Sequence, residues 1–323
     1  MAEELTFFMG GQQAVTELQL GAGASEGGSR TPVLRVGGET CLPFLFKEGA
    51  MPHRPVVAAE VFDVVEDDLP EALRQDLKGL LNDPVAWSKK MLSSGADLIC
   101  LKLAGIHPEG ANLGMDESRK LVQALLKAVS CPLIVLGCGQ AQKDNEVLPA
   151  ISEAAKGEKI LFGDAVQENY KTLTAACIAD GHSLIAESPI DVNIAKQLNI
   201  LISDLGLPLN RLAINPTIGA LGYGLEYAYS IMERARNAAL SGDKMLAMPF
   251  VCFVGQEAWR TKESKVSEKE HPSWGNARTR AIQWETTTAM AVLQAGADIL
   301  TLRHPQSIQI IKAELDELMK GAS

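Results

Sequence analysis

The chain has 323 residues, 46% of them hydrophobic, which is enough for one large domain with a sizeable core or for two ordinary domains. Lysine and arginine together number 30 and aspartate and glutamate 40, so the formal net charge at pH 7 is −10. An acidic chain without a basic run is a poor candidate for binding nucleic acid or an anionic membrane, and no apolar run reaches the roughly 18 residues of a transmembrane helix.

The amino terminus and the cysteines bear on location and metal content. The sequence begins Met-Ala-Glu-Glu, which lacks the basic start of a signal peptide, so we expect a cytoplasmic protein. No two of the six cysteines form a C-x-x-C pair, and the closest two, Cys131 and Cys138, are too far apart for a zinc or iron–sulfur motif. We therefore expect no metal site on this chain and interpret the cysteines as mostly buried, reduced core residues.

Residues 1–54 differ in pattern from the rest of the chain. Glycine-rich stretches interrupt short patterned segments there, and residues 16–20 and 32–36 alternate between apolar and polar side chains. This alternation predicts a β-hairpin. We interpret residues 1–54 as a β-rich extension that caps a main domain formed by residues 55–323.

From Pro55 onward one unit, a short apolar strand followed by a turn and an amphipathic helix, repeats eight times. The predicted strands are residues 55–60, 97–103, 132–137, 160–163, 184–187, 212–215, 249–254 and 299–302. The predicted helices lie near residues 84–94, 116–129, 144–156, 168–179, 191–205, 225–240, 277–295 and 305–319. Eight such units over about 265 residues match the size and strand number of an α/β protein with a (β/α)8 fold, the TIM barrel.

A doubly wound open sheet is the structural alternative to the barrel. Such a sheet usually has fewer strands and binds its ligand at the first glycine-rich turn, whereas the first strand here ends in Glu60-Val61-Phe62-Asp63. An internal repeat also favours the closed barrel. Residues 95–102 align with residues 296–303, and a His-Pro pair follows in both copies, which would be the second and eighth units.

The segment after the sixth strand combines several features of a ligand-binding loop. The strand should end at Asn215, because a residue that precedes proline is disfavoured in helical conformation. Glycines follow at positions 219, 222 and 224, together with Tyr223 and Tyr227, before a helix begins. Glycines allow positive φ angles and close approach of the backbone to a ligand. The pattern favours a binding loop, with a mobile connection as the alternative.

The carboxyl-terminal ends of the strands form the working face of a TIM barrel. Strand alternation places Cys100 and Lys102 toward the barrel axis, and likewise Ala213 with Asn215 and Thr301 with Arg303. The same reasoning predicts a polar ring of Glu60, Lys102, Glu187, Asn215 and Arg303. Such a ring is either a set of mutually paired charges that closes this end of the barrel or a ligand site. Buried charges must be paired in either case.

No sequence motif for hydrolysis or nucleotide binding is present. The chain contains no G-x-S-x-G, H-E-x-x-H or Walker sequence, and no D-x-H-x-x-G stretch of the kind that ligates cobalamin. One long charged loop, residues 261–276, contains Trp274 beside Gly275, which indicates that one end is fixed or meets a partner.

Several stretches together resemble one protein family, the small subunit of the corrinoid iron–sulfur protein, also called the delta subunit of acetyl-CoA decarbonylase/synthase. The resemblance covers nearly the whole chain. It rests on Gln167-Glu168-Asn169-Tyr170-Lys171, Gln197-Leu198-Asn199-Ile200-Leu201, residues 215–226, Ser230-Ile231-Met232-Glu233-Arg234, Gly242-Asp243-Lys244-Met245-Leu246, Gly255-Gln256-Glu257-Ala258-Trp259, Trp284-Glu285 and Arg303-His304-Pro305.

This resemblance implies a TIM barrel that forms a heterodimer with a larger subunit. In the family the larger subunit carries the iron–sulfur cluster and a mobile cobalamin domain, and the small subunit covers the corrinoid at the interface. The heterodimer takes a methyl group from a methyltetrahydrofolate methyltransferase and delivers it to acetyl-CoA synthase in the reductive acetyl-CoA pathway. The small subunit would then be non-catalytic, and no side chain of it would act as nucleophile or cobalt ligand.

For the cobalamin contact, the best candidates are the loop of residues 217–223 and the turn Gly137-Cys138-Gly139. Glycines would let backbone amides approach the corrin side-chain amides, and a tyrosine could bond through its hydroxyl while its ring packs. The competing view is that the glycines only shape turns. The full set of predicted cofactor contacts is Gly137, Cys138, Gly139, Asn215, Thr217, Gly219, Gly222, Tyr223 and Arg303.

Two other functions stay open from the sequence. A free-standing pterin-dependent methyltransferase would need Asp and Asn side chains at strand ends, and Asp164 and Asn215 meet that need. Lys102 and Arg303 suit a phosphate or carboxylate better, which favours the carrier subunit. A barrel enzyme with an unknown substrate is the third possibility.

Overall fold

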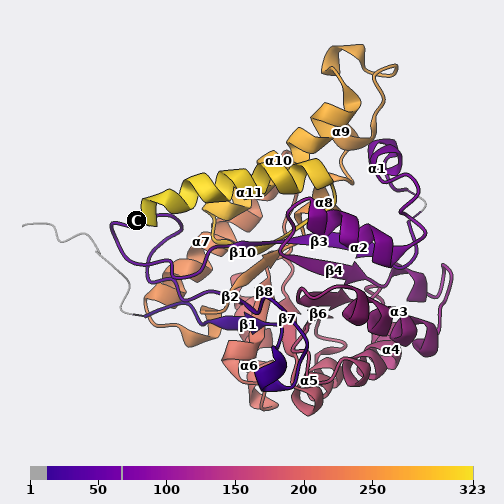
Figure 1. Cartoon of the computed structure of the whole chain (residues 1–323). Helices are drawn as coiled ribbons and strands as arrows, with labels where there is room; N and C mark the ends of the chain where they lie inside the picture. The colour runs from indigo at the N-terminus through magenta and orange to yellow at the C-terminus, as the bar shows by residue number, and fades with distance from the viewer. Residues whose placement is uncertain (1–12, 67, 323) are drawn as a thin grey trace, which may run out of the picture.

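The computed structural model describes residues 13–66 and 68–322, and its centre is a closed barrel of eight parallel strands (Figure 1). The strands follow one another around the barrel in chain order, and the last pairs with the first. They are β3 (Val56–Phe62), β4 (Leu98–Lys102), β5 (Leu133–Leu136), β6 (Leu161–Ala165), β7 (Ser183–Glu187), β8 (Leu212–Asn215), β9 (Phe250–Cys252) and β10 (Ala297–Leu302).

Helices follow the strands and cover the outside of the barrel. The longer ones are α2 (Pro84–Ser93), α3 (Met115–Ala128), α4 (Ala141–Ala154), α5 (Tyr170–Asp180), α6 (Val192–Asp204), α7 (Leu225–Leu240), α10 (Ala277–Gln294) and α11 (Pro305–Met319). Three short helices, α1 (Glu71–Asp76), α8 (Val254–Ala258) and α9 (Lys262–Lys265), lie near the carboxyl-terminal ends of the strands. Within the described ranges, no helix has the length and apolarity needed to cross a membrane.

The predicted TIM barrel is confirmed, and the open doubly wound sheet is excluded by the pairing of β10 with β3. The largest local difference concerns the seventh strand of the barrel. The sequence predicts a strand over residues 249–254, but β9 ends at Cys252 and Val254 already begins α8. The charged loop of residues 261–276 is also not wholly irregular, because it contains α9 and a short 3-10 helix, η5 (Pro272–Trp274).

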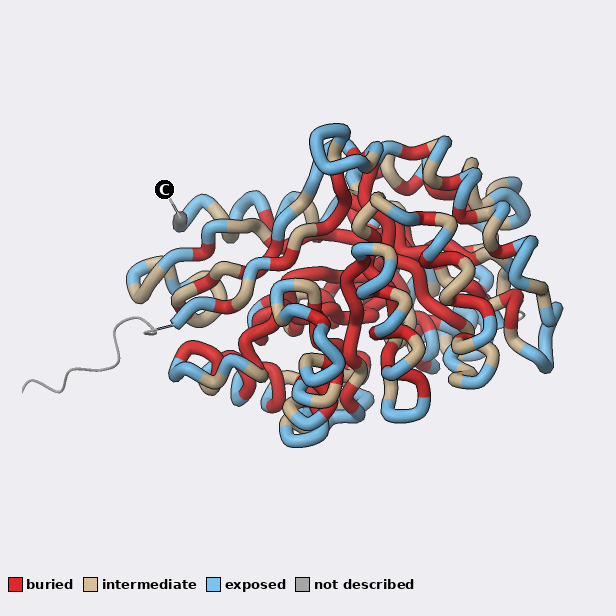
Figure 2. The backbone as a smooth tube through the Cα atoms, turned by 90° about the horizontal axis from the view of Figure 1, so that it is seen from below, coloured by how far each residue is buried: buried red, intermediate tan, exposed pale blue. Residues whose placement is uncertain are grey.

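The predicted alternation of side chains along the strands is confirmed for β4 and β8. Ile99 and Leu101 belong to the outer core between strands and helices, whereas Cys100 belongs to the core inside the barrel. In β8, Ala213 points inside and Ile214 outside. A buried layer on both faces of the strands is what a parallel barrel requires. In Figure 2 the strands accordingly form a buried centre, and exposed residues lie on the surrounding helices and loops.

An antiparallel hairpin closes the amino-terminal end of the barrel. It consists of β1 (Leu18–Leu20) and β2 (Leu34–Val36), each a shortened form of a predicted strand. Leu18, Leu20 and Val36 are fully or almost fully buried in the same core as the inward-facing barrel side chains. The hairpin therefore forms a floor for the barrel. The domain boundary at residue 54 stays a prediction.

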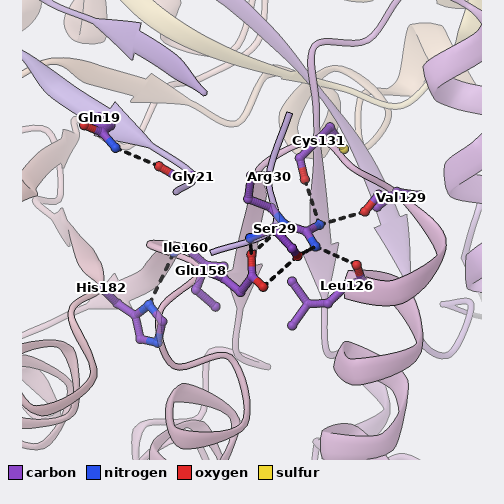
Figure 3. Close-up of polar contacts among 10 residues, drawn as sticks. All are labelled: Gln19, Gly21, Ser29, Arg30, Leu126, Val129, Cys131, Glu158, Ile160 and His182. Atoms are coloured by element: carbon purple, nitrogen blue, oxygen red, sulfur yellow. Dashed lines mark hydrogen bonds and ion pairs between the residues drawn. The ribbon is translucent and has the colours of Figure 1, made fainter. Parts of the chain in front are cut away.

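One buried arginine fastens the connection between β1 and β2 to the barrel (Figure 3). Nε of Arg30 lies 2.7 Å from a carboxylate oxygen of Glu158. The Arg30 guanidinium also donates to the carbonyl oxygens of Leu126, Val129 and Cys131, at and just beyond the end of α3. Helix carboxyl termini leave carbonyl groups without intrahelical partners and favour a nearby cation, so Arg30 caps α3 from a distant part of the chain.

Candidate functional site

The nine predicted cofactor contacts all lie at or beyond the carboxyl-terminal ends of three strands, β5, β8 and β10. They do not form a single cluster. Arg303 joins a buried ion pair, Asn215 and Thr217 join a half-buried polar group, and the two glycine-containing segments are each held by their own partners. We refer to this end of the barrel as the mouth and describe its parts in turn.

Arg303 forms a two-pronged ion pair with Glu60 across the β10–β3 seam. Nε and Nη2 of Arg303 lie 2.7 and 3.2 Å from the two oxygens of Glu60, and both side chains are almost fully buried. The guanidinium also stacks over the Phe62 ring, 4.8 Å from its centre. Of the predicted polar ring, Glu60 and Arg303 thus pair with each other, as the first of the two alternatives expected. Contact between Arg303 and a cofactor stays a prediction.

Lys102 does not share this pair. No carboxylate of the described residues lies within ion-pair distance of its amino group, so the predicted ring divides into two parts. Lys102 instead faces the carboxyl groups of Asp164 and Glu187 at longer range, and it lowers the pKa of both. We call the second part the polar recess, formed by Lys102, Asp164, Glu187, Asn215 and Thr217.

The carboxyl groups of the polar recess have raised pKa values. Burial, followed by the nearby Glu187 carboxylate, raises the pKa of Asp164 to about 8, and Lys102 and the Asn215 amide oppose part of that shift. Burial also raises the pKa of Glu187. Oδ1 of Asp164 has no hydrogen-bond partner among the described residues. A pKa of about 8 favours the protonated form of Asp164 near neutral pH, and one of its oxygens is left without a partner among the described residues.

The thiol of Cys100 lies in the core inside the barrel, within the electrostatic influence of both the ion pair and the polar recess. Burial raises its pKa well above the usual range, and the charges of Glu60, Lys102, Asp164 and Arg303 all act on it. A thiol with a raised pKa stays protonated and is a poor nucleophile. The mouth thus contains charged groups but no activated cysteine at its base.

The turn Gly137-Cys138-Gly139 is organised by Asp144, a residue of α4. The Asp144 carboxylate accepts hydrogen bonds from the backbone amides of Cys138 at 2.8 Å and Gly139 at 3.1 Å. A Cβ atom at position 137 would lie 2.2 Å from the Asp144 carboxylate, so only glycine fits there. The Cys138 and Gly139 amides are consequently engaged within the chain. Sequence reasoning missed Asp144, whose only signal is its place in the first turn of a helix after a glycine turn.

The loop after β8 has a fixed course. The backbone amide of Thr217 donates to Oδ1 of Asn215 at 2.9 Å, and its hydroxyl donates to the Ser188 carbonyl oxygen at 2.8 Å. Thr217 has a φ angle of +54°, an uncommon conformation for a β-branched residue. A Cβ atom on Gly219 would lie 2.3 Å from the Tyr223 carbonyl oxygen. Gly222 has a φ angle of +77° and open space around it. These contacts favour a shaped loop over a mobile connection.

Partners from α9 and α10 fix the far end of the loop. Nε1 of Trp284 donates to the Leu221 carbonyl oxygen at 3.1 Å, and the Leu221 amide donates to the Thr288 hydroxyl at 3.2 Å. The Tyr223 hydroxyl donates to Glu263 at 2.9 Å, although 51% of Tyr223 stays exposed. The loop therefore presents an exposed tyrosine on a rigid base. Sequence reasoning did not identify these partners, because they lie far along the chain.

An apolar groove of about 260 Å³ adjoins the polar recess at Glu187. It lies between the β6 and β7 ends and α6, and its other lining residues include Val166, Pro189, Ile194, Leu198 and Leu201. Ile190 and Ile194 beside it are 40% and 42% exposed.

The structure shows no candidate metal site in residues 13–66 and 68–322. No three His, Cys, Asp or Glu side chains there form a group that could hold an ion.

Comparison with known proteins gives consistent matches. Residues 17–313 match the family model described as CO dehydrogenase/acetyl-CoA synthase delta subunit. The acetyl-CoA decarbonylase/synthase complex subunit delta of Methanopyrus kandleri is 34% identical over 95% of this chain and 76% of its own length. The same subunit of Methanocaldococcus jannaschii is 34% identical over 92% of this chain and 72% of its own.

Solved structures with a similar fold include dihydropteroate synthases. The enzyme of Xanthomonas albilineans with 4-aminobenzoic acid gives a TM-score of 0.57 at 15% identity, covering 84% of this chain and 95% of that one. At this identity the likeness shows the barrel fold alone. The family model and the relatives, in contrast, each cover most of the chain, and so this protein belongs to the delta-subunit family of CO dehydrogenase/acetyl-CoA synthase.

Proposed function

We propose that this chain is the non-catalytic TIM-barrel subunit of a heterodimeric corrinoid iron–sulfur methyl carrier. A larger partner would hold the cobalamin and the iron–sulfur cluster, and this subunit would cover the corrinoid. The carrier would take a methyl group from methyltetrahydrofolate methyltransferase and deliver it to acetyl-CoA synthase. The relatives, named as subunits of the acetyl-CoA decarbonylase/synthase complex, support this assignment.

The chemistry of the mouth fits a cobalamin, which carries amide side chains around a broad apolar ring. Oδ1 of Asp164 is a buried oxygen without a hydrogen-bond partner among the described residues, and an amide group of the corrin could supply one. The exposed Tyr223 and the apolar groove at α6 provide ring and aliphatic surface at the mouth. The open space at Gly222 leaves the loop backbone accessible.

The observation that carries the proposal is that the mouth offers polar and apolar contact groups but no activated thiol at its base. Cys100 is a buried thiol with a raised pKa, and Arg303 is paired with Glu60. When bound, the corrinoid supplies the metal centre that carries the methyl group. The residues of this chain would orient the ring, exclude water and set the local electrostatic field.

The alternative of a free-standing pterin-dependent methyltransferase is not favoured. The matched relatives are complex subunits, and Oδ1 of Asn215, one of the two side chains proposed to pair with a pterin, already accepts the Thr217 amide.

The proposal is tested by co-expression of this chain with the larger subunit and measurement of corrinoid content from the absorption spectrum. We expect Gly222→Trp to lower the corrinoid content of the purified heterodimer, because the added ring would cover the loop backbone. Gly206→Trp is the matched control, since Gly206 also has a positive φ angle and open space but follows α6 at the other end of the barrel. Equal corrinoid content in the two variants would contradict a contact at this loop.

A further inference from the structure

A second cavity lies at the opposite end of the barrel from the mouth. It has a volume of about 340 Å³ and lies between the floor hairpin and the loops that lead into β6, β7 and β8. Its lining is rich in cationic and hydrogen-bonding side chains, namely Gln19, Arg35, Lys159, Ser183, Asn210 and Arg211. We call it the basal cavity.

One wall of the basal cavity is the face of the hairpin that points away from the barrel interior. Leu18, Leu20 and Val36 point into the barrel, so the alternate residues point away from it. Gln19 and Arg35 are direct cross-strand neighbours in this register. The barrel contributes residues from three successive strand entrances, so the cavity is lined by parts of the chain that only the folded barrel brings together.

Positive charge is in excess in the basal cavity, although the whole chain carries a net charge of −10. Among the described residues, Glu17 is the one carboxylate in the lining, and it lies 3.3 Å from Arg35, with both side chains about half exposed. Lys159 lies 2.6 Å from Glu26, which is outside the lining. Exposed pairs of this kind are worth roughly 0–1 kcal/mol, so they are readily exchanged for a stronger anion.

Arg211 is the cation without a carboxylate partner, since it forms no ion pair with any described residue. Its Nε donates to the His182 carbonyl oxygen at 2.9 Å, and Nη2 donates to the carbonyl oxygens of His182 and Cys177. These bonds fix the plane of the guanidinium. Its Nη1 has no acceptor in the part of the chain that the structure describes, so Arg211, a residue of the cavity lining, retains an unused donor.

We propose that the basal cavity binds the phosphoryl group of a small anionic molecule. A fixed guanidinium, a second arginine and a lysine suit a multiply charged oxyanion, whereas a single carboxylate would be satisfied by one of them. The Ser183 hydroxyl and the Asn210 amide supply neutral donors beside the cations. This site is separate from the proposed corrinoid contact, so either proposal can fail without the other.

The test is calorimetric titration of the heterodimer with inorganic phosphate, with ATP and, as a singly charged control, with acetate. We expect saturable binding of phosphate or ATP, little binding of acetate, and weaker binding at high salt. Tighter binding of ATP would identify a phosphate ester as the source of the phosphoryl group, and equal binding would identify free phosphate. Absence of saturable binding by both would overturn the proposal.

Two variants make the test specific to the cavity. Lys159→Gln should raise the dissociation constant about tenfold, because it removes one charge-assisted hydrogen bond. Lys89→Gln removes an equal charge from the exposed surface of α2 and should leave binding unchanged. Both proteins should fold, since Lys159 is partly exposed and Lys89 is exposed. Equal weakening in the two variants would show a diffuse charge effect and contradict the site.

Discussion

Both ends of the barrel contain buried ion pairs, but only the mouth also has a lysine and a carboxyl oxygen without a close partner among the described residues. Around the floor, Arg30 is paired with Glu158, and Arg236 on α7 is paired with Asp298 at 2.9 Å, with the second pair almost fully buried. At the mouth, Asp164 keeps an oxygen without a donor and Lys102 has no ion pair among the described residues. In TIM barrels the amino-terminal face is associated with stability and the carboxyl-terminal face with function. The difference indicates that the buried pairs around the floor are formed within this chain, and it fits the proposal above that a partner covers the mouth.

The largest effect should come from the floor. Arg236→Met would leave the Asp298 carboxylate and the nearby Glu39 without their cation in an almost fully buried site, so we expect a loss of roughly 3–5 kcal/mol in the free energy of unfolding. Urea denaturation measures the loss. The matched control is Arg35→Met, which breaks an exposed pair and should cost at most about 1 kcal/mol. Similar losses in both variants would remove the distinction between the floor network and surface pairs.

Lys102→Met should cost less, about 1–2 kcal/mol, because no described carboxylate pairs with Lys102 and its acidic neighbours can take up protons instead. Thermal unfolding measures the stability. The methyl-transfer rate of the folded, corrinoid-loaded complex should change little. A fall of about a thousandfold in that rate, with the complex stable and loaded, would instead be the size expected for loss of a catalytic group.

Asp164→Asn should alter how stability depends on pH. Asp164 has a pKa of about 8 in the folded chain, against about 4 in the unfolded chain, so between these values the folded state retains a proton that the unfolded state has lost. The contribution of Asp164 to stability therefore falls as the pH rises from about 4 to about 8. The asparagine variant should lose this dependence and gain about 1 kcal/mol or more relative to wild type above about pH 8.

Unfolding by urea at about pH 5 and about pH 9 distinguishes the outcomes for Asp164. Parallel pH profiles for the wild type and the variant would show that the Asp164 carboxyl titrates normally and that the polar recess is more hydrated than its burial indicates.

The smallest effect should come from the exposed loop. Tyr223→Phe removes the hydrogen bond to Glu263 but keeps the ring, so we expect a loss of at most about 1 kcal/mol in stability. Corrinoid content should fall only if the hydroxyl itself contacts the cofactor, which the absorption spectrum of the heterodimer measures. A large loss of stability would mean that this bond, and not Trp284 and Thr288, holds the loop.

The sequence was sufficient for the strands and their alternation because both depend on local patterns. Cys100 inside and Ile99 outside follow from the period of a strand, and the hairpin follows from two short alternating runs. The choice of partners was not predictable in the same way. Arg303 and Lys102 are both cations at strand ends, and only the packed barrel decides that Glu60 bonds Arg303. Tertiary contacts likewise determine the hydrogen bonds between Leu221 and α10 and the positive φ angle of Thr217.

The β10–β3 seam has a consequence for how the protein is made. The first strand of the barrel leaves the ribosome early, yet its second neighbour is the last strand to be synthesised. Until β10 arrives, β3 presents an unpaired edge of the kind that joins other chains. Pairing between segments so far apart in sequence is intrinsically slow, so we expect the nascent chain to be prone to aggregation through this edge during that interval. The part of the mouth that joins Glu60 of the first barrel strand to Arg303 beyond the last can form only after β10 has been synthesised.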